Sequence, residues 1–438
     1  MKSSVWHPNT QMREWSSFDT ISKGKGIWLI DAKGNKIIDA VGSMWCNVWG
    51  HSNPQLIKAI TKQSKQIQHS SLFNLTNEPV ERLAKNLIKI SPGMNKVFYS
   101  DNGSSAMEIA IKMALQYWKN IGDTKKTQIA TIENGYHGDT FGAMSVGYVP
   151  EFFGKFKKQL FSTIQFPVPN EYRLPKGFTL SDYQNHCLEK IEKRFSKNND
   201  IAAFIMESGA QMAGGVIIYP KGFQKKISEL CKKYNILFVL DEIATGFGRL
   251  GSMVQYQDQK SIPDIVAYGK MLTGGYLTMA ATLANKKIYD SFSGDFNDWK
   301  HLFHGHTYTG NPIAAAVANE NLQMYEKHNL IKKVQKTSKI FEKYSQEILD
   351  IDIVGDVRHK GMLMGIELVS NKKRKTPIRT KKSINKVFFE EGKKQGIYLR
   401  TLGNIVMLVP PLSIQENELE LLLKKTIKTI QIAKSKTF

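Results

Sequence analysis

The sequence lacks a hydrophobic run long enough to cross a membrane, which requires about 20 apolar residues. Its longest apolar runs, such as residues 236–240, have only the length of a strand. The first ten residues contain no apolar block followed by a small-residue cleavage site, as a signal peptide would. These absences predict a soluble, cytoplasmic protein.

Cysteine is scarce in this chain. The three cysteines, Cys46, Cys187 and Cys231, are odd in number and have no CxxC spacing. This pattern disfavours a disulfide framework, and we expect reduced thiols in the core of a cytoplasmic protein.

Acidic residues are few relative to basic ones. The 438 residues include 61 Lys+Arg and 39 Asp+Glu, which gives a net charge of +22. Such a charge suits nucleic-acid binding. The basic residues are scattered, however, and no helix-turn-helix, zinc-finger or RNA-binding signature accompanies them. Their densest run, Lys372–Lys382, contains Pro377 and is typical of a solvated loop or linker, so a Lys-rich solvated surface is the favoured interpretation.

Apolar runs of strand length alternate with amphipathic segments along the chain. Residues Ile111, Ala114, Leu115 and Trp118, for example, have helical spacing. The predicted strands are Lys96–Tyr99, Gln128–Ile132, Ile201–Met206, Ile236–Leu240 and Ile265–Tyr268. This alternation predicts an α/β fold with a mainly parallel sheet covered by helices on both faces.

Composition and length predict more than one domain. The 41% apolar and 23% charged fractions are close to globular averages, so we expect a sizeable core. We predict a large domain over residues 60–315 and a small α+β domain built from residues 1–59 and 316–438. Near the end, Ser413-x-x-Glu416 is a capping box ahead of apolar residues at helical spacing, which predicts a docked terminal helix.

Each predicted strand leads directly into a polar or glycine-rich segment. Because open parallel sheets bind ligands at the carboxyl ends of their strands, we expect the site there. The five segments are Ser100–Gly103, Asn134–His137, Glu207, Asp241–Glu242 and Gly269–Lys270.

Two residues in these segments suit chemistry on a carbonyl compound. Lys270 follows an apolar strand, and burial lowers a lysine pKa enough for Schiff-base formation. Asp241 ends a buried strand and therefore needs a positive partner, such as a protonated pyridine nitrogen. The competing interpretations are a solvated Lys270 and an ion pair between Asp241 and Arg249.

A predicted helix begins after the first of these strands, at Gly103-Ser104-Ser105, with Ser105-x-x-Glu108 as a capping box. The free N–H groups and positive dipole end of a helix suit a phosphate. Tyr136 offers a ring that can lie on a flat cofactor, or that can simply pack in the core.

Two further patterns suggest sites that we do not expect. Residues 246–251 match GxGxxG after a strand, but no amphipathic helix follows, which disfavours a dinucleotide site. His301, His304 and His306 lack an HExxH pattern and a nearby carboxylate, so we expect no metal.

Taken together, these segments resemble the class III pyridoxal-phosphate aminotransferases of fold type I. The likeness covers nearly the whole chain and implies pyridoxal 5′-phosphate as the cofactor. It rests on Trp6–Pro8, Asp101–Ser105, Met113–Trp118, Asn134–Thr140, Asp241–Arg249, Gly269–Gly275 and His304–Thr307.

The resemblance implies a role for each cofactor-binding residue. Lys270 would form the Schiff base with the cofactor and move the proton from the amino donor. Asp241 would bind the pyridine nitrogen, and Tyr136 would stack on the ring. Gly103 and Ser104 would bind the phosphate.

The resemblance also implies a homodimer with shared active sites. In this family Thr307 would reach the phosphate bound by the neighbouring subunit, with Gly305 and His306 beside it. Neither a nucleic-acid partner nor a membrane is expected.

The likeness further implies a substrate, 8-amino-7-oxononanoate, which would be converted to 7,8-diaminononanoate in biotin biosynthesis. Arg400 matches the arginine that holds its carboxylate, and a guanidinium fork suits that group. The residues expected to line the substrate pocket are Met44, Trp45, Tyr136, Gly305 and Arg400. Asn9 and Met44 replace aromatic residues of relatives that use S-adenosylmethionine, so the amino donor is S-adenosylmethionine or lysine.

Two other functions compete with this one. Another class III transaminase, acting on an ω-amine or diamine, would share the cofactor residues and differ in the substrate pocket. A basic nucleic-acid-binding protein on the same scaffold would explain the charge.

Overall fold

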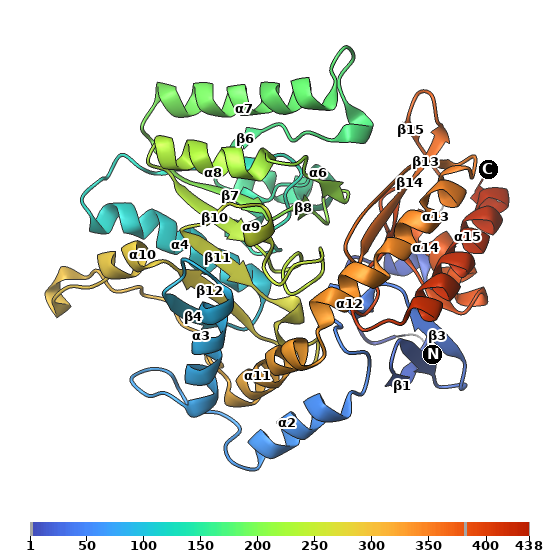
Figure 1. The fold of residues 1–438 in the computed structure, drawn as a ribbon, viewed down its shortest axis with the longest axis horizontal. Helices are drawn as coiled ribbons and strands as arrows, with labels where there is room; N and C mark the ends of the chain where they lie inside the picture. Colours follow the sequence, from blue (N-terminus) through green and yellow to red (C-terminus); the bar gives the residue numbers. More distant parts are fainter. Residues whose placement is uncertain (1–2, 381–382, 438) are drawn as a thin grey trace. The chain divides into compact units, whose positions relative to one another are not determined.

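The computed structural model describes residues 3–380 and 383–437, and the chain divides into two compact units. Residues 54–335 form what we call the large unit; residues 1–53 and 336–438 form the terminal unit. The predicted boundaries, 59/60 and 315/316, differ from these because α2 (Pro54–Ser64) packs against α11 (Pro312–Lys327) in the large unit. Figure 1 shows the helices and strands of both units, coloured along the sequence.

A seven-stranded sheet forms the centre of the large unit, in the order β4-β12-β11-β10-β7-β5-β6. Only β12 is antiparallel to its neighbours, so the predicted mainly parallel sheet is confirmed. The strands are β4 (Lys96–Ser100), β5 (Gln128–Ile132), β6 (Ile164–Phe166), β7 (Ile201–Glu207), β10 (Leu237–Asp241), β11 (Ile265–Tyr268) and β12 (Ala280–Ala284). All five predicted strands are present, each within one residue at either end.

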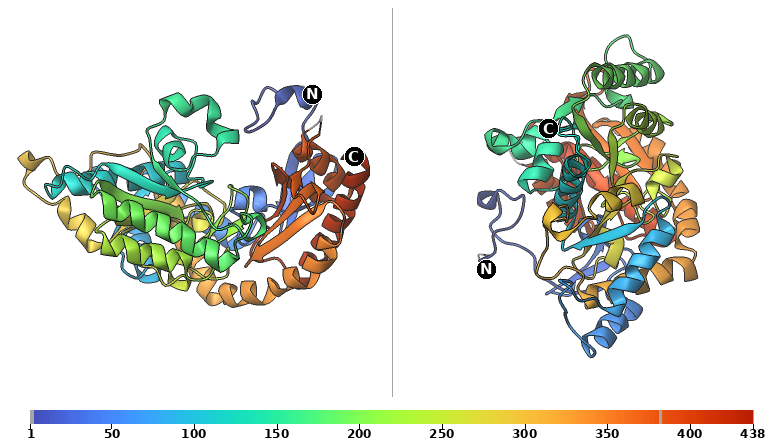
Figure 2. Two further views of the ribbon diagram at one scale, coloured as in Figure 1. Left: turned by 90° about the horizontal axis from the view of Figure 1, so that it is seen from above. Right: turned by 90° about the vertical axis from the view of Figure 1, so that its left-hand side faces the viewer.

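Helices cover both faces of this sheet, as predicted. Successive residues of a strand point to opposite faces. Leu237 and Val239 of β10 join the apolar core formed with α4 (Gly103–Asn120). On the other face, Phe204 of β7 packs edge-on against Phe195 of α7 (Leu180–Lys197), and α8 (Phe223–Lys233) lies beside α7 (Figure 1, Figure 2).

The start of α4 differs from the prediction. Its N-cap is Asn102, whose side-chain oxygen accepts the N–H of Ser105 at 2.9 Å. The Glu108 carboxylate accepts instead the N–H groups of Gly142 (2.8 Å) and Ala143 (3.2 Å), at the start of α5 (Phe141–Val146). The predicted capping box is therefore wrong, because Glu108 binds a segment that lies far along the chain.

The GxGxxG segment lies between β10 and a short helix. Residues 246–251 form turns, and the next helix, α9 (Gln255–Asp258), has four residues. The prediction that no amphipathic helix follows this motif is confirmed. The remaining elements of the large unit are α3 (Glu78–Ile90), α6 (Pro150–Phe153), α10 (Lys286–Ser291), β8 (Ala210–Gln211) and β9 (Ile217–Ile218); α12 (Leu330–Thr337) spans the boundary at 335/336.

The terminal unit contains two sheets, ordered β1-β2-β3-β16 and β13-β14-β18-β17, with β15 paired to β14. Its strands are β1 (Ile21–Lys25), β2 (Trp28–Asp31), β3 (Lys36–Asp39), β13 (Val354–Lys360), β14 (Leu363–Asn371), β15 (Thr376–Pro377), β16 (Ile397–Tyr398), β17 (Arg400–Leu402) and β18 (Ile405–Leu408). Its helices are α1 (Gly42–Trp45), α13 (Lys339–Leu349), α14 (Ile384–Lys394) and α15 (Glu416–Thr437). The first sheet joins the two terminal portions of the chain, because β16 pairs with β3.

The predicted terminal helix is confirmed as α15, but its cap is not the predicted one. The carboxylate of Glu418 accepts the N–H of Gln415 at 2.9 Å, and the helix begins at Glu416. The capping box at Ser413 and Glu416 is therefore wrong by two residues. The predicted apolar face is buried in the terminal unit, at Leu419, Leu422, Leu423, Ile427 and Ile430.

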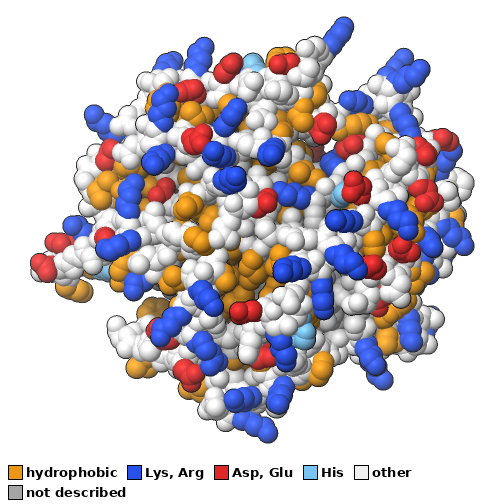
Figure 3. Space-filling model, in the orientation of Figure 1, with side chains coloured by type: hydrophobic (Ala, Val, Ile, Leu, Met, Phe, Trp, Pro, Cys, Tyr) orange, Lys and Arg blue, Asp and Glu red, His pale blue; other side chains and the backbone are white. Residues whose placement is uncertain are grey.

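The basic run Lys372–Lys382 is mostly exposed, and β15 lies within it; Lys381 and Lys382 lie outside the described residues. Lys and Arg side chains are spread over the face shown in Figure 3, with acidic side chains among them. Cys187 and Cys231 are buried free thiols, whereas Cys46 is only half-buried. In the described ranges, no helix is long and apolar enough to cross a membrane.

The corrected cap of α4 generates the first prediction. Replacing Asn102 by Ala should lower the free energy of unfolding by about 1 kcal/mol, because the Ser105 N–H loses its acceptor. Replacing Ser105 by Ala should change it by less than about 0.5 kcal/mol. Urea denaturation of the cofactor-free protein, followed by circular dichroism, measures both. A larger loss in S105A than in N102A would contradict the observed cap.

Candidate active site

The carboxyl ends of β4, β5, β7, β10 and β11 lie at one edge of the sheet, as expected. Three of the segments that follow these strands approach one another closely around the side chain of Ile243. A Cβ atom on Gly103 would lie 2.8 Å from it, and a Cβ atom on Gly269 would lie 3.1 Å from it. The start of α4, the end of β10 and the turn that holds Lys270 therefore meet around one side chain.

Asp241 ends β10 and is buried, with 5% of its surface exposed. Its Oδ2 lies 2.8 Å from Nδ1 of the buried His137, and its Oδ1 accepts the N–H of Ile243 at 2.9 Å. Held in this way, the buried carboxylate favours a cationic group beside it.

Glu207, at the end of β7, holds the next segment of the site. Its carboxylate accepts the N–H of Tyr136 at 3.2 Å and that of Met212 at 3.0 Å. Burial raises the pKa of Glu207 to about 7; the nearby Asp241 adds to the rise, whereas His137 and the two N–H donors oppose it. Glu207 thus fixes the backbone of the residue that carries the predicted cofactor-stacking ring.

The ring of Tyr136 is half-buried and stacks near Phe153, with 6.1 Å between ring centroids. Its hydroxyl donates to Asp139 at 3.0 Å. Burial, and after it the Asp139 carboxylate, raises the pKa of Tyr136 above its ordinary value, so the hydroxyl stays protonated at neutral pH. The ring is thus held on one side and at its hydroxyl.

The first turn of α4 contacts the segment that carries Tyr136. The Ser104 hydroxyl accepts the N–H of Thr140 at 3.1 Å and lies 3.1 Å from the Thr140 hydroxyl. Gly138 lies between them with φ +126°, and a Cβ atom there would be 2.1 Å from the Ser104 hydroxyl. A side chain at position 138 would therefore push the two segments apart.

Lys270 is half-buried and begins a short turn, residues 270–273, with φ +41°. A left-handed backbone at a residue other than glycine is strained, and such strain is typical of functional sites. Asn321 of α11 holds this turn, because its side-chain amide donates to the carbonyl groups of Met271 (2.8 Å) and Leu272 (3.0 Å). The strained position of Lys270 is thus fixed from outside the turn.

The segment of His304–Thr307 lies beside an exposed apolar groove of the large unit. A cavity of about 590 Å³ is lined by residues of α3, of β4, of this segment (His304 and Gly305) and of the loop before α3 (Phe73 and Leu75). Phe73 is 64% exposed and Phe303 is 79% exposed. In the described residues, no group of three or more His, Cys, Asp or Glu side chains could hold a metal ion.

The predicted substrate residues Met44, Trp45 and Arg400 belong to the terminal unit. Arg400 starts β17, and its guanidinium lies 3.4 Å from the sulfur of Met44 in α1. Trp45 is buried, whereas Met44 is 44% exposed. Two of the three predicted residues are therefore brought into contact although 356 positions separate them.

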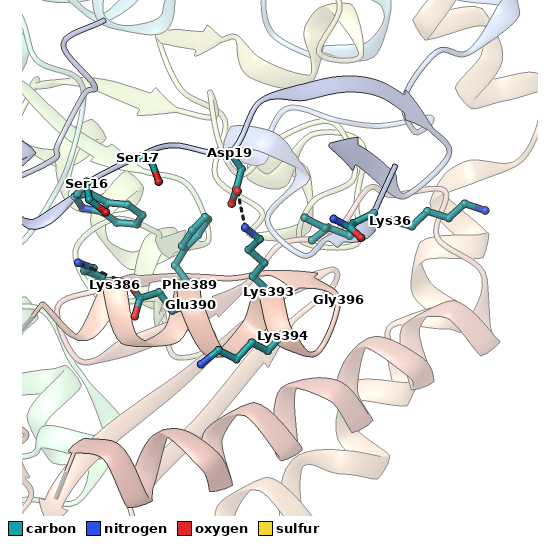
Figure 4. Close-up of a pocket in the computed structure, with 13 residues that line it drawn as sticks. Ser16, Ser17, Asp19, Lys36, Lys386, Phe389, Glu390, Lys393, Lys394 and Gly396 are labelled. Atoms are coloured by element: carbon teal, nitrogen blue, oxygen red, sulfur yellow. Dashed lines mark hydrogen bonds and ion pairs between the residues drawn. The ribbon is translucent and has the colours of Figure 1, made fainter. Parts of the chain in front are cut away.

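The terminal unit has a cavity of about 640 Å³, and none of the predicted site residues lines it (Figure 4). It is lined by Trp15, Asp19, Phe389, Lys393 and others. Lys393 forms an ion pair with Asp19 at 2.5 Å, and Lys386 forms one with Glu390 at 3.7 Å. Two of the four lysines that line this cavity are therefore paired with carboxylates that also line it.

Comparison with known proteins identifies the family of the chain. The pattern of the family Aminotransferase class-III matches residues 11–430. The chain belongs to the class-III aminotransferase family. The adenosylmethionine-8-amino-7-oxononanoate aminotransferase of Staphylococcus aureus (strain NCTC 8325 / PS 47) is 44% identical, over 96% of this chain and 94% of that protein. The enzyme of the same name from Geobacter sulfurreducens is 40% identical, over 97% of this chain and 96% of that protein.

Solved structures of class-III aminotransferases share the fold of the whole chain. The crystal structure of adenosylmethionine-8-amino-7-oxononanoate aminotransferase from Methanocaldococcus jannaschii has a TM-score of 0.92 at 41% identity and covers 98% of this chain and 97% of that chain. The ω-transaminase of Pseudomonas jessenii in complex with PMP has a TM-score of 0.94 at 29% identity, covering 99% and 97%. The fold is therefore that of the type I pyridoxal-phosphate enzymes.

Class-III aminotransferases depend on pyridoxal 5′-phosphate, and the residues present fit that group. The buried carboxylate of Asp241 suits a protonated ring nitrogen. The N–H groups in the first turn of α4, an 18-residue helix, suit a phosphate. The amine of Lys270 suits a carbonyl.

Sequence reasoning missed several residues that hold the site together. The sequence patterns predict no role for His137 or Asn321, and they predict a helix cap for Glu108. Each contacts a residue at least 34 positions away, so local patterns in the sequence carry no signal for these contacts.

The raised pKa of Glu207 predicts a dependence of stability on pH. Between pH 4.5 and about 7 the folded chain holds a proton on Glu207 that the unfolded chain releases, so the free energy of unfolding falls as pH rises through this window. Glu207→Gln removes this loss. The stability of the variant relative to the wild type should therefore rise by roughly 3 kcal/mol between pH 4.5 and pH 8.

Urea denaturation at a series of pH values measures this difference. Burial also raises the pKa of Glu242 to about 7, but Glu242 is present in both proteins and its effect cancels. Glu151→Gln, at an exposed position, is the matched control. A difference between E207Q and wild type that does not change with pH would contradict the prediction.

Proposed function

We propose that this class-III aminotransferase transfers an amino group to the keto carbon of 8-amino-7-oxononanoate, forming 7,8-diaminononanoate in biotin biosynthesis. The observation that carries the proposal is the name shared by its relatives in Staphylococcus aureus and Geobacter sulfurreducens, which match over nearly their whole length. The guanidinium of Arg400, which lies beside the sulfur of Met44, supports it, because a guanidinium fork suits a substrate carboxylate. We place the reaction in the cytoplasm.

The bound cofactor, pyridoxal 5′-phosphate, supplies an electrophilic carbonyl and a ring that withdraws electrons from the reacting carbon. In our proposal Asp241 would pair with the proton on the ring nitrogen, and His137 orients that carboxylate. Tyr136 would lie against the ring. Gly103 and Ser104 would bind the phosphate through the start of α4.

Lys270 is the proposed catalytic residue. Its Nζ would hold the cofactor through the carbonyl, and as a free amine it would move the proton of the donor carbon. The strained turn supports this role, because Asn321 fixes the backbone from which the lysine side chain extends. Asn321 is a positioning residue for this turn.

Substrate recognition is proposed for Met44, Trp45 and Arg400, together with Tyr136 and Gly305. The guanidinium of Arg400 binds the substrate carboxylate, since its planar fork can donate two parallel hydrogen bonds. Met44 contacts that guanidinium and limits the positions it adopts. Asn9 and Met44 leave S-adenosylmethionine and lysine as candidate amino donors.

We further propose that the active unit is a homodimer. Thr307 would bind the cofactor phosphate of the second copy, with Gly305 and His306 beside it. The exposed apolar side chains around this segment support an interface, because Phe73, Phe303 and Tyr308 are each at least 60% exposed. Apolar patches of this kind mark protein interaction sites.

Amino transfer to 8-amino-7-oxononanoate tests the proposed function. The purified protein, loaded with pyridoxal 5′-phosphate, is given this substrate with S-adenosylmethionine, with lysine or with an aromatic ω-amine, and 7,8-diaminononanoate is measured by mass spectrometry. We expect product with S-adenosylmethionine or lysine. Lys270→Ala should lower the rate at least about 1,000-fold, because covalent binding and proton transfer are both lost, whereas K286A, at an exposed lysine, should not.

The outcomes of this assay separate the candidate functions. Product with neither S-adenosylmethionine nor lysine would contradict the proposal. Transfer from the ω-amine to a simple keto acid, measured in a parallel reaction, without activity on 8-amino-7-oxononanoate, would favour the second candidate. The likeness to the Pseudomonas jessenii ω-transaminase is the observation behind that alternative.

The role of Arg400 predicts a selective kinetic effect. Arg400→Lys should raise the KM for 8-amino-7-oxononanoate about 10-fold or more, because one charge-assisted hydrogen bond of the fork is lost. The KM for the amino donor should change less than about 2-fold, and R374K, at an exposed arginine, should have neither effect. Steady-state kinetics with each substrate varied in turn measures both constants. An equal rise in the two KM values, or no rise at all, would contradict the assignment.

A further inference from the structure

A row of polar side chains on α4 holds the segment of residues 300–304. Lys112 Nζ donates to the carbonyl of Phe303 at 3.0 Å and lies 3.1 Å from Nδ1 of His304. Gln116 and Asn120, further along the same helix, donate to the carbonyl of Lys300 at 3.1 and 3.0 Å. This anchored segment leads directly into Gly305-His306-Thr307.

The imidazole rings of His304 and His306 contact each other through their Nε2 atoms. Their Nε2 atoms are 3.1 Å apart, so one of them must carry the hydrogen and the other must accept it. A lysine ammonium only donates, so Nδ1 of His304 is the acceptor for Lys112. A neutral His304 then carries its hydrogen on Nε2 and donates it to Nε2 of His306.

This chain of hydrogen bonds determines the tautomer of His306. Because Nε2 of His306 accepts, a neutral His306 carries its hydrogen on Nδ1. In the part of the chain that the structure describes, no side chain or backbone group bonds to this Nδ1. The backbone around it is fixed, because the His306 N–H donates to the Thr309 hydroxyl at 2.9 Å and the His306 carbonyl accepts the Thr309 N–H at 3.1 Å.

The surroundings of His304 keep it neutral. Burial lowers the pKa of the His304 imidazole, and the neighbouring Lys112 and His306 lower it further, whereas Glu108 opposes them. Phe98 of β4 packs edge-on against the ring at 6.1 Å and brings no charge. At neutral pH, His304 therefore accepts from Lys112 and donates to His306.

We propose that Lys112 acts through His304 to select the Nδ1-protonated tautomer of His306, which makes His306 a hydrogen-bond donor to a phosphate monoester. This inference rests on the proposed function, in which the phosphate is that of the cofactor bound by a second copy of the chain. His306 is the binding residue. Lys112 and His304 are positioning residues, because they act through it.

Nuclear magnetic resonance of the holoenzyme, deuterated and labelled with 15N in its histidine rings, tests the tautomers directly. Long-range 1H–15N correlations distinguish a protonated Nδ1 from a protonated Nε2, and His304→Gln and His306→Gln assign the signals. We expect His304 protonated on Nε2 and His306 protonated on Nδ1. A His306 protonated on Nε2 in the wild type would overturn the proposal.

Variants of Lys112 test whether this residue selects the tautomer. Lys112→Met should shift His306 to a mixture of tautomers and weaken pyridoxal 5′-phosphate binding about 10-fold, measured by fluorescence titration without substrate. Lys112→Arg keeps a cationic donor and should retain most of both properties. Lys119→Met, at an exposed lysine of the same helix, should change neither.

The outcomes distinguish this inference from the proposed function. A His306 tautomer that is unchanged in K112M would overturn the role of Lys112, whatever the substrate is. A changed tautomer with unchanged cofactor affinity would overturn the assignment of the phosphate as the acceptor. The expected tautomers and affinities together with no amino transfer to 8-amino-7-oxononanoate would support the inference and contradict only the substrate proposal.

Discussion

The buried carboxylate of Asp241 is the constraint on which the site of the large unit depends. An ionised acid at the end of a central strand is costly to bury unless donors surround it and a cation lies beside it. The donors are His137 and the N–H of Ile243, and they fix the position of both carboxylate oxygens. In our account the cation is the protonated ring nitrogen of the cofactor. Cofactor binding would therefore stabilise the buried carboxylate.

Several hydrogen bonds fix the neighbouring segments of the site relative to Asp241. Glu207 binds the backbone of Tyr136, next to the histidine that holds Asp241. Ser104 and Glu108 bind the following segment from α4, so the helix start that suits a phosphate also holds the segment that carries the ring residue. Asn321, in α11, binds the turn of Lys270 through the carbonyl of Met271. Hydrogen bonds between segments that are distant in the sequence thereby hold together the residues proposed for the ring, the phosphate and the carbonyl of the cofactor.

Much of this fold could be predicted from local sequence patterns, because strands such as Ile265–Tyr268 are apolar runs bounded by polar residues. The polar ends of those strands likewise indicated where the site lies. The caps could not be predicted in the same way. Ser105 and Glu108 satisfy the spacing of a capping box, yet Asn102 caps the helix and Glu108 binds Gly142. Contacts such as His137 with Asp241, separated by 104 positions, depend on the order of the strands in the sheet and have no local pattern.

The protonation state of the cofactor ring nitrogen tests the central claim most directly. Pyridoxal 5′-phosphate labelled with 15N at that atom, bound to the protein, gives a chemical shift that distinguishes a protonated from an unprotonated nitrogen. Our account predicts a protonated nitrogen in the wild type at pH 7.5 and an unprotonated one in Asp241→Asn, because the variant lacks the negative charge that stabilises the proton. An unprotonated nitrogen in the wild type, or a protonated one in the variant, would contradict the account.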